Sequence, residues 1–247
     1  MNCKLCGEEI KNKPDIRKIL NKYSACYYTC SKCGLYYVDS PVWLGEAYND
    51  VIAFNDTGIM MRNKINVIKV SNIINRNGIM LDYGGGFGIF ARMMRDVGYD
   101  FRWFDKFAAP LLIKGFEYNH EKIDWITCFE CLEHFDDVRG DIDKLFTISK
   151  NIIISTELYD PSNIHTDSTW DYLCLETGQH ITFYSLETMK FIAEKYNVYY
   201  YHICGLHVFS EKKIGYFKRA YIRIKTKVQL FLNRTSYFYC AKDRKIN

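Results

Sequence analysis

Two Cys-x-x-Cys-Gly units near the N-terminus carry the first residues with recognisable chemistry, and 23 residues separate Cys6 from Cys30. Two such turns can supply four thiolates to one tetrahedral Zn²⁺, and the glycine after each pair lets backbone N–H groups face the sulfur atoms. Four thiolates fill the coordination sphere and leave no position for water. We therefore predict a structural zinc ion held by Cys3, Cys6, Cys30 and Cys33.

A glycine-rich turn marks a second site. Residues 79–83 form a short apolar run that predicts a buried strand, and Gly84, Gly86 and Gly88 follow with G-x-G-x-G spacing. A strand–turn–helix unit brings a ligand to the carboxyl end of its strand. The G-x-G-x-x-G spacing of dinucleotide loops is not met, which disfavours an NAD or nucleotide-sugar enzyme. Asp105 ends the next predicted strand, where a carboxylate can accept hydrogen bonds from both ribose hydroxyls of an adenosine.

The elements that must position these residues alternate along the chain. Predicted strands near 79–83, 101–104, 125–129 and 152–154 are separated by helical patterns, and strands near 198–203 and 206–209 follow a helix over 185–196. This order predicts an α/β fold, a Rossmann-like doubly wound, mostly parallel sheet with an antiparallel edge, plus a small N-terminal zinc ribbon. The expected parts are a zinc-ribbon-like module (1–41), a catalytic domain (42–210) and a basic C-terminal segment (211–247).

Composition and charge narrow the class of protein. The chain has 247 residues, of which 48% are hydrophobic and 25% charged, as in globular domains. Neither a signal peptide nor an apolar run of transmembrane length is evident, so we expect a cytoplasmic protein whose cysteines stay reduced. Residues 211–247 hold 11 basic and 2 acidic residues, whereas the remainder holds 22 basic and 27 acidic residues.

Three segments in this order resemble class I S-adenosylmethionine-dependent methyltransferases. They are Leu81-Asp82-Tyr83-Gly84-Gly85-Gly86-Phe87-Gly88, then Asp105, then Phe129-Glu130-Cys131-Leu132-Glu133-His134. The chain looks most like the small-molecule branch that joins a Cys-x-x-Cys zinc ribbon to this core. The segment 178–185, which reads Gly-Gln-His-Ile-Thr-Phe-Tyr-Ser, is similar to a stretch before the penultimate helix of that branch.

The resemblance implies S-adenosylmethionine as cofactor and assigns roles around it. Glycines of the loop would lie beside the methionine part and the ribose, and Asp105 would hold the ribose. A short third strand would bring Phe116 and Glu117 to the adenine. Glu130 and Cys131, after the next strand, would line the methionine side. The implied cofactor-binding residues are Gly84, Gly86, Gly88, Asp105, Phe116, Glu117, Glu130 and Cys131.

The connection over 155–184 is long, and long loops often carry function. In this fold it would stand over the carboxyl ends of the strands and contact the methyl acceptor. A hydroxyl acceptor must lose its proton, a task that suits histidine, so His180 and His134 are the candidate catalytic residues. The acceptor pocket is expected to include Glu157, Tyr159, Trp170, Tyr172 and Gln179.

These observations favour a methyltransferase that acts on oxygen of a small metabolite. The resemblance suggests bacterial secondary metabolites, or sugar and phosphate-type precursors of capsule and other surface polysaccharides. The alternative is a zinc-containing nucleic-acid-binding protein or RNA methyltransferase, which is disfavoured because the zinc segment is not unusually basic and no Asn-Pro-Pro-Tyr-type motif occurs. The oligomeric state is not predicted.

The basic C-terminal segment has helical periodicity. Its apolar stripe comprises Ile214, Phe217, Tyr221, Ile224, Val228 and Phe231. The favoured interpretation packs this helix on the domain and leaves a basic face in solvent. The alternatives are contact of this helix with an anionic membrane, with a nucleic acid or with an acidic substrate.

Overall fold

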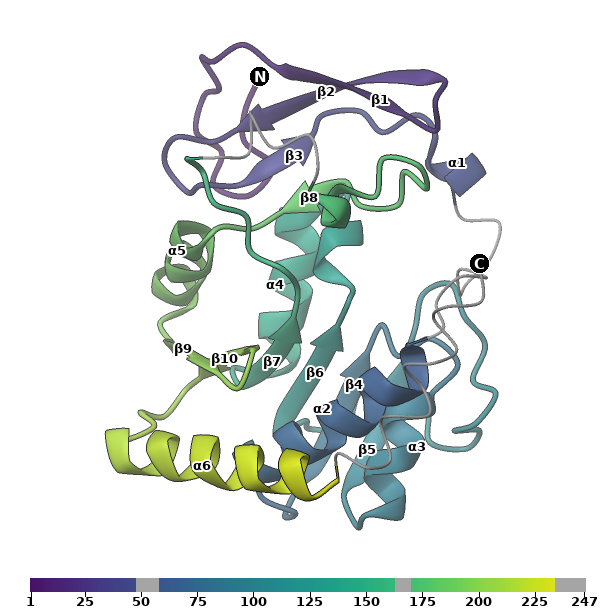
Figure 1. Cartoon of the computed structure of the whole chain (residues 1–247), viewed down its shortest axis with the longest axis vertical. Coiled ribbons are helices and arrows are strands. Elements are labelled where there is room, and N and C mark those ends of the chain that lie inside the picture. The colour runs from purple at the N-terminus through teal and green to yellow at the C-terminus, as the bar shows by residue number, and fades with distance from the viewer. Residues whose placement is uncertain (48–57, 163–169, 234–247) are drawn as a thin grey trace.

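The computed structural model describes residues 1–47, 58–162 and 170–233 of the chain. A six-stranded sheet with helices on both faces forms the larger layer, and a smaller four-stranded sheet lies across one end of it (Figure 1). Parts of the expected connector, of the loop 155–184 and of the C-terminal segment fall on 48–57, 163–169 and 234–247, outside the described residues.

The larger sheet has the strand order β5-β4-β6-β7-β10-β9. The first four strands are parallel, whereas β10 pairs antiparallel with both β7 and β9. This arrangement confirms the predicted α/β fold with a mostly parallel sheet and an antiparallel edge. The strands are β4 (Ile79–Tyr83), β5 (Asp100–Phe104), β6 (Trp125–Phe129), β7 (Ile152–Ser155), β9 (Tyr199–Ile203) and β10 (Leu206–Ser210).

Helices cover both faces of this sheet because the central strands are apolar on both sides. On β7, Ile152 and Ile154 pack toward α4 (Val138–Ile148) and α5 (Leu186–Tyr196), while Ile153 packs toward the opposite face. That opposite face is covered by α2 (Ile59–Ile73), α3 (Ile89–Asp96) and α6 (Tyr216–Leu232). None of the described helices is both long and apolar enough to cross a membrane.

The smaller sheet is antiparallel and draws its last strand from far along the chain. Its order is β1 (Asp15–Ile19), β2 (Tyr23–Thr29), β3 (Tyr36–Val38) and β8 (Thr182–Phe183). Stacked aromatic rings fill its core, with the centroids of Tyr27 and Tyr36 5.1 Å apart. The expected boundaries at residues 41 and 210 stay predictions, and β8 extends the N-terminal sheet with residues from the larger segment.

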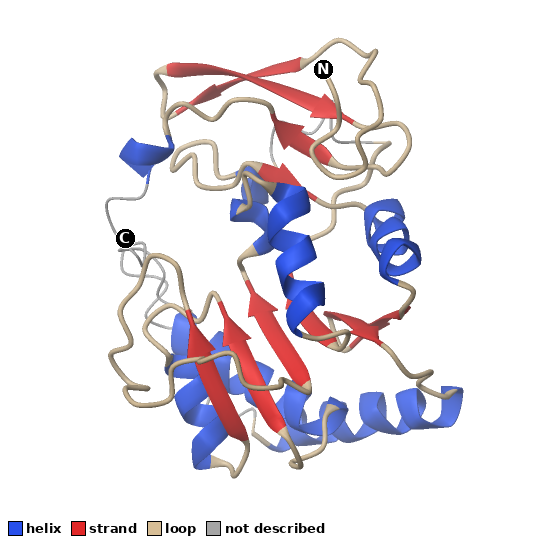
Figure 2. Ribbon diagram, turned by 180° about the vertical axis from the view of Figure 1, so that it is seen from behind, coloured by secondary structure: helices blue, strands red, loops and turns tan. Residues whose placement is uncertain are grey.

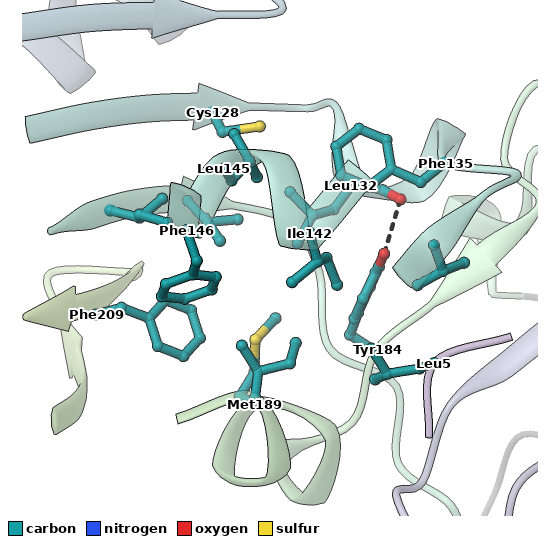
Figure 3. Packing of buried hydrophobic residues seen from close by; sticks show 14 of the residues in the cluster. Leu5, Cys128, Leu132, Phe135, Ile142, Leu145, Phe146, Tyr184, Met189 and Phe209 are labelled. Atoms are coloured by element: carbon teal, nitrogen blue, oxygen red, sulfur yellow. Dashed lines mark hydrogen bonds between the residues drawn. The ribbon is translucent and has the colours of Figure 1, made fainter. Parts of the chain in front are cut away.

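Four hydrogen bonds align the segment 179–184 with the residues that follow β6. Tyr184 Oη donates to the carbonyl of Leu132 at 3.1 Å, within a core that also contains Met189 and Phe209 (Figure 3). Ile181 N–H donates to the carbonyl of Glu133 at 2.9 Å. The two remaining bonds join His134 to Gln179 and Thr182 to Phe135. The 3-10 helix η1 (Leu132–His134) and the approach to β8 are thus held side by side.

Candidate functional site

The glycine turn between β4 and α3 adopts the geometry that its sequence requires. Gly84, Gly86 and Gly88 have φ values of 72°, 53° and 84°, a region that side chains other than glycine rarely enter. A Cβ at position 84 would lie 2.6 Å from Cys131 Sγ, so this glycine permits a close approach to the residues after β6. A Cβ at position 86 would have no neighbour within 4 Å, so this part of the loop borders open space.

Asp105 holds the same turn from the end of β5. Its Oδ2 accepts a hydrogen bond from Gly86 N–H at 2.8 Å, and its Oδ1 accepts from the N–H groups of Phe107 and Ala108 at 2.7 and 2.8 Å. The carboxylate is only partly buried. It therefore lies beside the glycine loop and also orders the chain that follows, and its contact with a ribose stays a prediction.

A cavity of about 310 Å³ joins the glycine turn to the two candidate histidines. Its volume falls in the range typical of small-molecule sites. Of the predicted residues, it brings together Gly84, Gly86, Glu130, His134, Gln179 and His180. Sequence reasoning missed one polar wall of it, formed from α2 by Arg62, Asn63 and Asn66. These side chains precede the recognisable motifs, and no local pattern marks them.

Asp82 is a further lining residue that sequence reasoning missed. Its side chain is buried, and its Oδ1 accepts from Thr127 Oγ1 at 2.9 Å. Its Oδ2 has no hydrogen-bond partner among the described residues. Burial raises the pKa of this carboxyl to about 7. The single acid within an otherwise apolar and aromatic strand was the available signal, because such a residue is rarely buried without a partner.

Backbone carbonyls set the tautomers of the two histidines. His134 Nδ1 lies 3.0 Å from the carbonyl of Gln179, and His180 Nδ1 lies 2.6 Å from that of Tyr172. A carbonyl only accepts, so each Nδ1 carries the hydrogen and each Nε2 carries a lone pair. The ring centroids are 5.0 Å apart. The structure thus pairs the two candidates at one wall of the cavity.

Burial keeps these imidazoles neutral near pH 7. Desolvation lowers the pKa of His134 and of His180 below the ordinary value of 6.5, and the Glu133 carboxylate partly opposes this shift at His180. Glu133 is itself buried, and its oxygens accept from Tyr172 Oη at 2.7 Å and Thr156 Oγ1 at 3.2 Å. Sequence reasoning did not assign Glu133 a role.

Besides Cys131 and Tyr172, seven predicted site residues are not among those that line the cavity. Phe116 packs under the Arg95 guanidinium at 3.6 Å, and the neighbouring third strand is reduced to a single bridge between Trp103 and Glu117. Trp170 Nε1 donates to Glu157 at 2.7 Å. Tyr159 and Trp170 lie in the aromatic core of the smaller sheet. The seven residues are Gly88, Asp105, Phe116, Glu117, Glu157, Tyr159 and Trp170.

Tyr172 and Cys131 support the site from behind. Tyr172 contacts both Glu133 and His180, with its ring centroid 4.7 Å from that of His180. Cys131 packs against the position of Gly84. Neither lines the cavity directly, so their predicted contacts with ligands stay predictions.

The four N-terminal cysteines converge on one point. Cys3 and Cys33 Sγ atoms are 3.6 Å apart, those of Cys6 and Cys30 are 3.5 Å apart, and all four lie within 4.8 Å of one another. A tetrahedral ion with Zn–S bonds of about 2.3 Å separates its sulfur ligands by roughly 3.8 Å. Leu5 N–H donates to Cys3 Sγ at 3.4 Å. The cluster could therefore hold a metal ion with little rearrangement.

Comparison with known protein families identifies the family of this chain. The family described as "Methyltransferase domain" matches residues 62–203, more than half of the chain, and the protein belongs to this family. No curated protein matches the sequence significantly. The structure is similar to an O-methyltransferase family protein from Burkholderia thailandensis, with 15% identity, a TM-score of 0.48 and coverage of 69% of this chain and 68% of that one.

Two other solved structures are similar at the same level. Human N-acetylserotonin methyltransferase shares 14% identity with a TM-score of 0.48, covering 68% of this chain and 56% of its own. Magnesium protoporphyrin IX methyltransferase from Synechocystis shares 14% identity with a TM-score of 0.46, and the match covers 68% of this chain and 92% of that one. The present chain therefore spans little more than half the length of the human protein.

Proposed function

We propose that this protein transfers a methyl group from S-adenosylmethionine to an oxygen atom of a small molecule. The observation that carries the proposal is one cavity that joins a G-x-G-x-G turn to two neutral histidines. The acceptor class we propose is a hydroxyl-bearing metabolite, including sugar or phosphate-type precursors of surface polysaccharides. Family membership supplies the reaction type, and the donor set of the cavity supports the cofactor and the acceptor atom.

The residues around the glycine turn fit S-adenosylmethionine. Asp105 offers a carboxylate for ribose hydroxyls, and the open space beside Gly86 allows a ligand to approach the backbone closely. The unpartnered Oδ2 of Asp82 suits a positively charged or donating group of the ligand. When bound, this cofactor offers a methyl carbon activated by a sulfonium, whose transfer forms an O–C bond and leaves the C–S electron pair on sulfur.

The histidines would accept the proton that the acceptor hydroxyl loses. A hydroxyl must lose its proton as the O–C bond forms, and a neutral imidazole with an Nε2 lone pair can take it. The Glu133 carboxylate favours the charged form of His180 and would stabilise the imidazolium that results. The α2 side chains Asn63 and Asn66 offer amides to orient a polar acceptor.

The cysteine cluster would serve as a structural zinc site. It lies in the N-terminal segment, whose β3 pairs with β8, and β8 follows directly on His180 and Ile181. A zinc ion there would stabilise the smaller sheet and so the segment that carries His180.

We expect Asp105→Ala to weaken binding of S-adenosylhomocysteine by about 10- to 100-fold, because a hydrogen bond to a charged group contributes about 1.5–3 kcal/mol. Isothermal titration calorimetry measures this loss. Asp96→Ala, which removes an exposed carboxylate at the end of α3, should leave the affinity unchanged. Unaltered affinity in Asp105→Ala would remove this residue from the cofactor site.

Metal analysis of the purified protein should give about one zinc per chain, the stoichiometry of a single four-thiolate site. The double substitution Cys30→Ala and Cys33→Ala should abolish zinc retention and lower the melting temperature, because binding free energy of a structural metal is folding free energy. The matched pair Cys26→Ala and Cys174→Ala lies outside the cluster and should keep the ion. Zinc retained after the first pair of substitutions would contradict the assignment.

His180→Ala should lower kcat for a hydroxyl acceptor by about 10²–10⁴, the usual contribution of a general base, and leave cofactor affinity near wild type. Because burial lowers the pKa of this histidine, the wild-type rate should fall only as pH drops below 6.5, where the imidazole becomes protonated. Rates are measured with methyl-labelled cofactor, and added imidazole tests whether the activity lost in His180→Ala can be restored. His202→Ala, at an exposed position of β9, is the control, and equal rates in the two variants would refute the role.

A further inference from the structure

A second group of metal-ligand side chains lies beside the glycine turn. Apart from the four cysteines, the described residues bring together Glu133, His134 and His180, with one donor atom of each within 4.8 Å of the others. His134 and His180 also line the cavity. A single ion with bonds of about 2.0–2.2 Å spaces tetrahedral ligands roughly 3.5 Å apart, so closure on the order of 1 Å completes the site.

The surrounding hydrogen bonds are those that metal ligands need. Each histidine donates its Nδ1–H to a backbone carbonyl, which orients the ring and directs the lone pair of Nε2 away from that carbonyl. Glu133 is held by Tyr172 Oη and Thr156 Oγ1, and each of its oxygens keeps further lone pairs. These contacts preset three ligands that come from η1 and from the approach to β8.

The donor types select the kind of ion. Two neutral imidazoles and one carboxylate suit divalent first-row transition metals, and three protein ligands leave coordination positions open for water or substrate. Low histidine pKa values help, because a ligand nitrogen must be unprotonated. The buried Glu133 carboxylate also gains from a cation, since a charged group away from water needs a partner of opposite charge.

We propose that Glu133, His134 and His180 bind one divalent transition-metal ion whose open position takes the acceptor oxygen. The inference rests on the proposed function for the identity of that oxygen. A hydroxyl bound to such an ion has a lowered pKa, so its proton passes to solvent. The resulting alkoxide would form an O–C bond to the methyl carbon as the C–S bond breaks and its electron pair stays on sulfur. The imidazoles then act as ligands, and the metal takes over the stabilisation of the developing anion.

Cobalt(II) titration of the protein that retains its structural zinc tests this site. Absorption bands of the bound ion should saturate at one equivalent and lack the sulfur-to-cobalt charge transfer of a thiolate site. His180→Gln should weaken binding by more than the 10–100-fold that loss of an outer-shell partner costs. His202→Gln is the matched control and should bind like wild type.

Calorimetry with S-adenosylhomocysteine separates the two proposals. Retained cofactor affinity in His180→Gln shows that the variant is folded and that the cofactor site is intact. Absence of cobalt binding in wild type, equal binding in His180→Gln, or full methyl transfer after chelation would overturn the metal site and leave the proposed function standing. Failure of the wild-type protein to bind S-adenosylhomocysteine would instead refute the proposed function.

An independent observation concerns α6, which packs on the domain as the favoured interpretation expects, but not through the predicted apolar stripe. The helix packs on the domain through Ile222 and Thr226, and Asn72 of α2 donates to Thr226 and Gln229. The predicted stripe faces away from the domain, because all of its residues except the buried Ile214 are more than half exposed. The exposed members are Phe217 (87%), Tyr221 (64%), Ile224 (65%), Val228 (51%) and Phe231 (69%).

Cations flank this exposed stripe along the helix. At helical spacing the stripe is centred opposite to Ile222, with Lys218 and Lys225 on one side of it and Lys227 on the other. The helix runs along the base of the molecule, and the parallel strands of the larger sheet point away from it (Figures 1 and 2). An apolar face with flanking lysines matches a helix that lies in the interface of an anionic bilayer.

We infer that α6 docks the protein on an anionic lipid surface. The aromatic and aliphatic stripe favours a bilayer over nucleic acid, whose backbone contacts are mainly with cationic and polar groups. The cofactor cavity would stay accessible, because its glycine turn follows the carboxyl end of β4, and the parallel strands point away from α6.

Co-sedimentation with phosphatidylglycerol–phosphatidylcholine vesicles tests the surface. Ile224→Gln should weaken partitioning by about tenfold or more, the effect of losing one large buried aliphatic side chain. Ile16→Gln, at an equally exposed isoleucine of β1, is the control. Binding should also weaken in high salt and on vesicles of phosphatidylcholine alone. Absence of vesicle binding, or binding only to single-stranded RNA, would overturn the inference.

Discussion

The alignment of the segment 179–184 with residues 132–135 is the constraint on which the site depends. Four hydrogen bonds join these two stretches, which lie some 50 residues apart in the chain. One stretch ends the parallel strand β6, and the other enters the antiparallel strand β8. Because the bonds fix both, residues that follow β6 and residues that precede β8 present their side chains to a common cavity.

The chemistry of the site follows from this alignment. It brings the buried Glu133 together with the partly buried His134 and His180, and desolvation raises the pKa of the Glu133 carboxyl and lowers the pKa of both imidazoles. The carbonyls that fix the two tautomers belong to the same stretch and to the preceding turn, so backbone geometry directs the reactive nitrogen atoms. Metal binding and proton acceptance both require neutral imidazoles, and the lowered pKa values of His134 and His180 favour the neutral form.

Much of the fold could be predicted from the sequence, because alternating apolar strands and helices have distinct periods and the glycines 84–88 mark the turn between β4 and α3. The cysteine spacing likewise indicated a cluster that the structure brings together. The α2 wall was not predictable, since Arg62, Asn63 and Asn66 reach the cavity only through helix packing. The exposure of the α6 stripe was not predictable either, because periodicity identifies an apolar face without showing what covers it.

Nitrogen-15 chemical shifts of the histidine rings test the central claim most directly, because they report tautomer and protonation state in solution. The account predicts that His134 and His180 are neutral near pH 7 with the proton on Nδ1, and that both Nε2 resonances move when S-adenosylhomocysteine is added. It would be contradicted by rings that are protonated at pH 7, that carry the proton on Nε2, or that do not respond to this ligand.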